Sequence, residues 1–198
     1  LATGLVEQLQ LDEVWFIPAA IPWMKEGMVI ASSDDRIEMV RLGIEHEPRF
    51  QVCDWEVRSG GYSYTIDTLK RARREMDNSD EAFVIIGSDV IHRFLEWKQY
   101  DEILSLSTLV VVMRPGFEYD AEDEAINKLA RMGRVVPVKT PVLDIQSSDI
   151  RDRISNQEFV SAMVPAKVEE HIRMRGLYHL DTRINNKARR EHLEGTDK

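Results

Sequence analysis

The stretch Ile145–Arg151 carries side chains that are suited to binding an anion. It follows an apolar, extended run and opens an amphipathic segment. Ser147 and Ser148 are typical N-cap residues, because a serine hydroxyl accepts a free backbone N–H of the first helical turn. Those N–H groups and the positive end of the helix dipole attract anions, and Arg151 could hold the same anion through a planar, charge-assisted pair. The stretch predicts a phosphate site; the simpler alternative is a capped helix with a surface arginine.

A second group of candidate residues follows the strongest strand signal of the chain, residues 82–86. In an open parallel sheet, ligands bind beyond the carboxyl ends of the strands. Gly87 permits close approach of the backbone, and Asp89 offers a carboxylate for ribose hydroxyls; the alternative for Asp89 is a turn and a helix cap. Trp97 could stack on an aromatic ring, although most tryptophans fill a core.

A third group lies at the start of a predicted helix, around Tyr64 and Thr65. Ser63 or Thr65 is expected to cap this helix. Tyr62 and Tyr64 beside a capped helix start could hold a planar ligand or a carboxylate. The alternative is aromatic packing over a loop. Lys25, in the loop at 20–30, could face a ligand or be solvated.

Short apolar runs alternate with amphipathic segments along the chain. The predicted strands are 14–19, 50–57, 82–86, 109–113 and 135–138. The predicted helices are 1–10, 32–45, 66–76, 121–132, one that opens at 147, and one between Pro165 and Gly176. This alternation predicts an α/β fold with a mainly parallel sheet that helices cover on both faces.

Length and composition restrict the class of protein. The 198 residues suit one domain over residues 1–180, followed by a polar tail at 181–198. A net charge of −9 argues against nucleic acid as a partner, and no apolar run is long enough for a membrane helix. No leader is visible, so we expect a cytoplasmic protein. Cys53 is expected to be a buried, inert thiol, and the histidines lack zinc-site spacing.

Several weak motifs occur in an order that resembles the bacterial nicotinate-nucleotide adenylyltransferases. The motifs are Leu11–Pro18, Pro22–Lys25, Asp35–Met39, Ser63–Leu69, Gly87–Asp89, Trp97-Lys98, Arg114–Gly116, Ile145–Arg151 and Val164-Pro165 with Gly176–Tyr178. Each motif is unspecific alone, and the ordered set, spanning roughly Leu1 to Tyr178, carries the resemblance.

The resemblance implies a Rossmann-like nucleotidyltransferase of NAD biosynthesis. Such an enzyme transfers AMP from ATP to nicotinic acid mononucleotide and releases pyrophosphate, using Mg²⁺ with ATP. The substrate phosphate is itself the nucleophile, so positioning and charge stabilisation carry the rate. The resemblance assigns ATP binding to Ser147, Ser148, Arg151, Gly87 and Asp89, and mononucleotide binding to Tyr64, Thr65, Trp97 and Lys25. Within that set, Tyr64 and Thr65 would meet the pyridine carboxylate with backbone donors, and Trp97 would stack on the ring.

The sequence departs from the family at its start. The family begins with a glycine-rich turn after its first strand and a His-x-Gly-His motif that contacts the ATP phosphates, and this sequence has neither. The catalytic residues are therefore unknown here. The absent strand would lie centrally in the sheet, so we expect either upstream residues or a groove in its place. Gln146, where the family usually has serine, is a smaller departure.

Two other functions are compatible with these residues. One is a related adenylyltransferase that acts on nicotinamide mononucleotide or pantetheine phosphate. The other is a nucleotide-binding module without catalysis, if the histidine motif is truly absent. A carboxylate and an amide require different partners, so competition between acceptors would discriminate the enzymes. The oligomeric state is left open, with a homo-oligomer among the alternatives.

Overall fold

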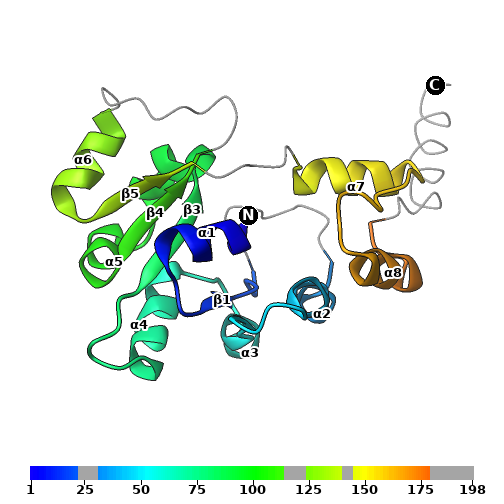
Figure 1. Cartoon of the computed structure of the whole chain (residues 1–198), viewed down its shortest axis with the longest axis horizontal. Helices are drawn as coiled ribbons and strands as arrows, with labels where there is room; N and C mark the ends of the chain where they lie inside the picture. Colours follow the sequence, from blue (N-terminus) through cyan, green and yellow to red (C-terminus); the bar gives the residue numbers. More distant parts are fainter. Residues whose placement is uncertain (22–30, 114–123, 140–144, 179–198) are drawn as a thin grey trace, which may run out of the picture. The chain divides into compact units, whose positions relative to one another are not determined.

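The computed structural model describes residues 1–21, 31–113, 124–139 and 145–178. In chain order, the elements are α1 (Ala2–Leu9), β1 (Val14–Phe16), α2 (Ser33–Ile44), β2 (Phe50–Val52), α3 (Trp55–Ser59), α4 (Thr65–Glu75), β3 (Phe83–Gly87), the 3₁₀ helix η2 (Ser88–Glu96), α5 (Tyr100–Leu106), β4 (Thr108–Val112), α6 (Glu124–Met132), β5 (Val135–Val138), α7 (Ser147–Ser155) and α8 (Ala166–Arg175). The chain divides into two compact units (Figure 1). The first holds all of these strands with α1, α3–α6 and η2, and the second holds α2, α7 and α8.

All strand pairs within the two sheets are parallel, as the alternating pattern predicted. β1 pairs with β2, and β4 lies between β3 and β5. The register sets Val14 beside Phe50 in one sheet, and Gly87 beside Val112 in the other. Within the described residues, no ladder joins the two sheets.

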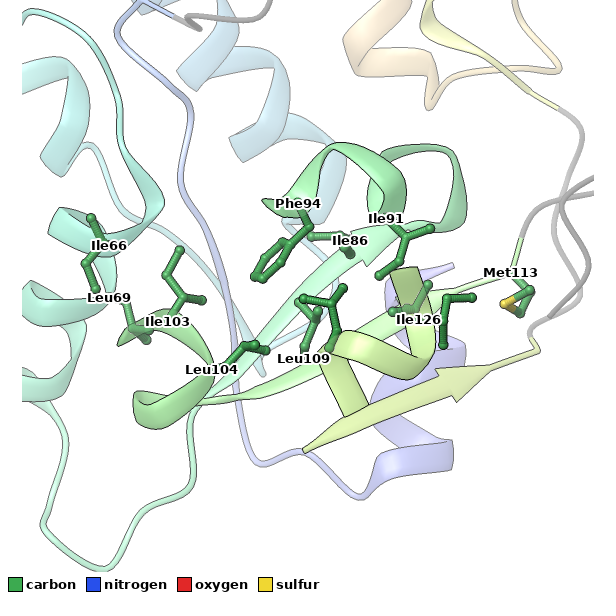
Figure 2. Packing of buried hydrophobic residues seen from close by; sticks show 12 residues of the cluster. Ile66, Leu69, Ile86, Ile91, Phe94, Ile103, Leu104, Leu109, Met113 and Ile126 are labelled. Atoms are coloured by element: carbon green, nitrogen blue, oxygen red, sulfur yellow. The ribbon is translucent and has the colours of Figure 1, made fainter. Parts of the chain in front are cut away.

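The core of the first unit forms on both faces of β4, whose residues are all buried. Leu109 and Val111 point into the larger cluster, and Val110 and Val112 point into the other, because successive strand side chains alternate between faces. Figure 2 shows the larger cluster, in which helices α4, α5, α6 and η2 cover one face of the sheet. Leu5 of α1 covers the opposite face. The predicted arrangement, a parallel sheet between helices, is confirmed.

The segment 50–57 differs from the single strand that was predicted. The strand ends at Val52, and α3 begins at Trp55. The Arg58 N–H donates to the Asp54 carbonyl at 2.9 Å, a helical i→i−4 bond that replaces sheet pairing. The Trp55 ring contacts Trp15 edge-on at 5.4 Å and lies under the Arg71 guanidinium at 4.8 Å. The apolar residues that suggested a longer strand therefore belong to a short helix, in which they are partly buried.

Candidate functional site

The predicted phosphate-binding helix is α7, in the second unit. Its N-cap is Gln146, which is extended at φ −109° and ψ 145° and makes no side-chain capping bond. The prediction that Ser147 or Ser148 caps the helix is wrong, because both already have helical backbone geometry as the first two residues. A cap must be non-helical, and only the residue before them is. Both hydroxyls are exposed, and the Gln146 side chain does not cap the first-turn N–H groups.

Arg151 follows in the same helix and is half-buried. Burial raises the pKa of the Tyr178 hydroxyl, and the positive charges of Arg151 and Arg36 partly oppose that rise. Tyr178 packs with Ile150 against the core of this unit, which consists of Ile154, Val160, Val168 and Ile172. Leu177 packs against the same core, so the segment after α8 folds back onto this unit. Tyr178 therefore lies within electrostatic range of one arginine on α7 and one on α2.

The second unit is held together by an acidic residue that the sequence did not single out. The Asp35 side chain is buried, and its Oδ1 accepts a hydrogen bond from Arg175 Nε at 2.9 Å. The same oxygen lies 3.2 Å from His171 Nε2. Ser32 Oγ donates to Asp35 Oδ2 at 2.6 Å and accepts the Asp35 N–H at 3.1 Å, which caps α2. The hydrogen bond from Ser32, followed by that from Arg175, lowers the pKa of Asp35 to about 2.

In the first unit, the predicted pyridine-binding loop lies at the N-terminus of α4. Tyr64 is the extended N-cap, and Thr65 begins the helix without a side-chain capping bond. Neither Ser63 nor Thr65 caps the helix, so that prediction is wrong. The Ser63 hydroxyl instead accepts the Ala20 N–H at 2.8 Å, and its own N–H donates to the Ile21 carbonyl at 3.2 Å. These bonds fix the loop and leave the first-turn donors of α4 without a capping side chain.

The strand end predicted to hold a sugar is present. Gly87 is the last residue of β3, and η2 begins at once with Ser88, which is buried, and Asp89, which is exposed. An exposed carboxylate beyond a parallel strand is well placed for a hydroxylated ligand. The backbone of Gly87 has φ −79°, so the turn itself does not demand glycine.

Trp97 ends η2 and packs partly buried against the larger cluster, with its ring 5.0 Å from that of Phe94. Its indole nitrogen is buried and has no hydrogen-bond partner within the part of the chain that the structure describes. Tyr64 packs against the same cluster. The ammonium of Lys98 lies 4.4 Å from the centre of the Tyr64 ring and 2.9 Å from Asp67 Oδ2. The structure thus brings Tyr64, Thr65 and Trp97 into one region, with Lys98 over the Tyr64 ring.

The cytidylyltransferase-like family model matches residues 1–153. A "Probable nicotinate-nucleotide adenylyltransferase" of Geobacillus thermodenitrificans is 33% identical over 93% of this chain and 80% of its own length. The protein of the same name from Thermomicrobium roseum is 36% identical over 89% of the chain and 82% of its own length. The chain belongs to the nicotinate-nucleotide adenylyltransferase family.

Solved structures agree with this family in fold. The Plasmodium falciparum nicotinic acid mononucleotide adenylyltransferase complexed with NaAD has a TM-score of 0.69, covers 89% of both chains and is 16% identical. A putative nicotinate-nucleotide adenylyltransferase of Vibrio parahaemolyticus has a TM-score of 0.58 at 18% identity and covers 89% of this chain and 85% of its own. The chain therefore has the Rossmann-like nucleotidyltransferase fold that the resemblance implied.

Some of the segments that the sequence analysis singled out lie outside the described residues. These are Lys25 with its loop, the turn Arg114–Gly116 and the tail at 181–198. Among the residues that are described, no group of three or more His, Cys, Asp or Glu side chains is arranged to hold a metal ion. No described helix has the length and apolar character needed to span a bilayer.

Proposed function

We propose that this chain catalyses the transfer of AMP from ATP to nicotinic acid mononucleotide, giving nicotinic acid adenine dinucleotide and pyrophosphate in NAD biosynthesis. The observation that carries the proposal is the similarity to nicotinate-nucleotide adenylyltransferases: 33% identity over 93% of the chain for one relative and 36% over 89% for another. The candidate binding residues come from the motifs around Tyr64, Trp97 and Ser147, on which the sequence resemblance rests.

The α7 helix is proposed to bind the phosphates of ATP. Its first turn has free N–H donors, two exposed serine hydroxyls at Ser147 and Ser148, and the positive end of a nine-residue helix. The Arg151 guanidinium presents a planar set of donors that suits a phosphate. Each of these groups is a stronger partner for a phosphate that carries more negative charge, so they would stabilise the developing charge on the leaving pyrophosphate.

The mononucleotide is proposed to bind at α4 and Trp97. The uncapped N–H groups at the start of α4 suit the pyridine carboxylate, and the tryptophan ring offers a surface on which the pyridine can stack. Gly87 and Asp89, at the end of β3, would contact nucleotide sugar, with Asp89 accepting hydrogen bonds from hydroxyls. Lys25 would lie near the substrate phosphates.

The chemistry requires no nucleophile from the protein. A phosphate oxygen of the mononucleotide attacks the α-phosphorus of ATP, the bond between the α- and β-phosphates breaks, and pyrophosphate leaves. The protein's part is to align the two reactants and to stabilise the charge that develops on the leaving group. ATP enters as its Mg²⁺ complex; Mg²⁺ commonly retains several waters and binds to substrate phosphates, so a protein cage of carboxylates is not needed.

The test is an acceptor panel. The protein, produced from its complete reading frame, is incubated with Mg²⁺-ATP and one of three acceptors: nicotinic acid mononucleotide, nicotinamide mononucleotide or pantetheine phosphate. We expect the highest kcat/KM for nicotinic acid mononucleotide, with one pyrophosphate released for each dinucleotide formed. A higher kcat/KM for either of the other acceptors would contradict the proposed substrate.

A further inference from the structure

Lys98 places a positive charge beside the proposed pyridine-binding loop. Its ammonium is 4.4 Å from the centre of the Tyr64 ring, and Tyr64 is the N-cap of α4. Trp97, proposed to stack on the pyridine, is its neighbour in sequence. A cation over an aromatic face is attracted by the negative centre of the ring, which fixes where the lysine head lies.

A carboxylate opposes this lysine charge. Asp67 Oδ2 lies 2.9 Å from the Lys98 ammonium, and both side chains are about half-exposed, at 44% for Lys98 and 58% for Asp67. Asp67 stands in the first turn of α4, and its N–H donates to the Tyr64 carbonyl at 3.0 Å. The pair therefore sets one positive and one negative charge beside the same helix start.

Nicotinic acid mononucleotide and nicotinamide mononucleotide differ at that position by a full negative charge. The backbone donors of α4 can bond to the oxygen of an acid or of an amide, so on their own they discriminate only in part. A nearby ammonium acts on the charge difference directly, and it does so at a distance, because Coulomb interactions fall only as the inverse of separation.

We propose that Lys98 is a specificity-determining residue that favours the carboxylate of the pyridine substrate, and that Asp67 limits the strength of this preference. The inference rests on the proposed function and concerns the same site. Both groups are partly exposed, so solvent screens them and the effect is moderate. Removal of the lysine charge is expected to lower the preference for the acid over the amide, and removal of the aspartate charge to raise it.

The test compares Lys98→Gln, Asp67→Asn and the double variant. The measured quantity is the ratio of kcat/KM for nicotinic acid mononucleotide to kcat/KM for nicotinamide mononucleotide, at saturating Mg²⁺-ATP. We expect Lys98→Gln to lower this ratio by about three- to tenfold and Asp67→Asn to raise it by a similar factor. The double variant is expected to return close to the wild-type ratio.

The opposite signs separate a charge effect from a structural one. If the ion pair only fixes the Lys98 side chain to α4, either variant breaks it. The acid-to-amide ratio of kcat/KM would then change in the same direction in both variants, or in neither of them. That result would overturn the inference on Lys98 and leave the proposed function intact, since the wild-type protein would still form the dinucleotide. A wild-type protein that forms no dinucleotide from either acceptor would overturn the proposed function and the inference together.

A matched control is the ion pair of Lys70 with Glu102, also anchored on α4. Its N–O distance is 2.8 Å, and its side chains are 38% and 35% exposed. Lys70→Gln removes a lysine charge from a later turn of α4, and Glu102→Gln removes its carboxylate partner from the first turn of α5. Neither is expected to change the acid-to-amide ratio, and a change equal to that in Lys98→Gln would overturn the assignment to Lys98.

Discussion

Asp35 and Arg175 are 140 residues apart in the sequence, and Asp35 Oδ1 accepts a hydrogen bond from Arg175 Nε at 2.9 Å. The same oxygen lies 3.2 Å from His171, one helical turn before Arg175 on α8. Asp35 stands in the first turn of α2, where the helix dipole also favours a negative charge. This buried carboxylate therefore joins α2 to α8 and caps α2 through Ser32.

Asp35→Asn is expected to lower the thermal stability of the second unit at pH 7. The pKa of Asp35 falls from its ordinary value of 3.8 to about 2 in the folded chain, because Ser32 and Arg175 bond to the ionised form. Because the pKa is lower in the folded chain, the ionised carboxylate raises the free energy of unfolding above pH 3.8, and this contribution is lost as the pH falls toward 2. The difference in melting temperature between the wild type and the variant should therefore narrow between pH 4 and 2, as scanning calorimetry would show.

The control for this prediction is Asp34→Asn, at the exposed neighbouring position of the same helical turn. It removes the same charge from the first turn of α2, whereas the contacts with Arg175 and His171 are made by Asp35. A stability loss in Asp34→Asn as large as that in Asp35→Asn would mean that the helix dipole, not the buried network, accounts for the effect.

Gly133→Ala is expected to destabilise the first unit by ~1–3 kcal/mol, the scale of overpacking in a filled core. A Cβ at Gly133 would lie 2.8 Å from the Leu104 Cβ and 3.0 Å from the Leu104 carbonyl oxygen, so α5 and the end of α6 would have to separate. The measurement is the midpoint of urea unfolding. Gly4→Ala is the control, since nothing lies within 4 Å of its Cβ and helix propensity should make it neutral or stabilising.

Trp97→Ala should weaken binding of nicotinic acid mononucleotide by ~1–3 kcal/mol, the scale of aromatic stacking on a base, and leave ATP affinity nearly unchanged. Titration calorimetry with each ligand separately would measure both. Phe94→Leu is the control, because Phe94 is fully buried against Trp97 and its truncation disturbs the core without removing the stacking ring. An equal loss of affinity for both ligands in Trp97→Ala would contradict the assignment of Trp97 as the stacking residue.

Arg151→Ala should raise the KM for ATP by about tenfold or more, the loss of one charge-assisted pair to a phosphate, and affect the mononucleotide less. Initial-rate kinetics with each substrate varied would separate the two. Arg153→Ala is the matched control. Arg153 lies in the last turn of α7, away from the helix N-terminus, and its guanidinium contacts Glu158 at 3.3 Å. An unchanged ATP KM in Arg151→Ala would remove the phosphate role of this arginine.

The features that depend on local pattern were predictable from the sequence. The apolar run 109–113 is buried on both faces as β4, and Val168 and Ile172 point inward on α8, because the periods of strand and helix are properties of a few neighbouring residues. Gly176 ends α8 in the left-handed region at φ 59°, as a glycine after a helix indicates.

The exact helix starts were not predictable in the same way. Ser147 and Ser148 are both good cap residues, yet the chain enters α7 one residue earlier and Gln146 takes the cap position. Ser63 was available to cap α4, but its hydroxyl is used by the backbone of Ala20, 43 residues away. Such choices depend on distant groups that compete for the same hydroxyl, and a local pattern does not contain them.

Contacts between distant segments were missed for the same reason. Nothing near Asp35 in the sequence indicates His171 or Arg175, and Lys98 was seen only as part of the Trp97-Lys98 motif, without a role. Its place over Tyr64 follows from the packing of η2 and α4 on one cluster. The family resemblance could supply the candidate binding residues, but not the charges that surround them.

The formation of nicotinic acid adenine dinucleotide is the measurement that tests the proposed function most directly. The protein from its complete reading frame is mixed with Mg²⁺-ATP and nicotinic acid mononucleotide, and the dinucleotide and pyrophosphate are followed over time. We expect both products to appear in equal amounts over many turnovers. Binding of both substrates without any dinucleotide would mean a nucleotide-binding module, and would contradict the assignment of this chain as an adenylyltransferase.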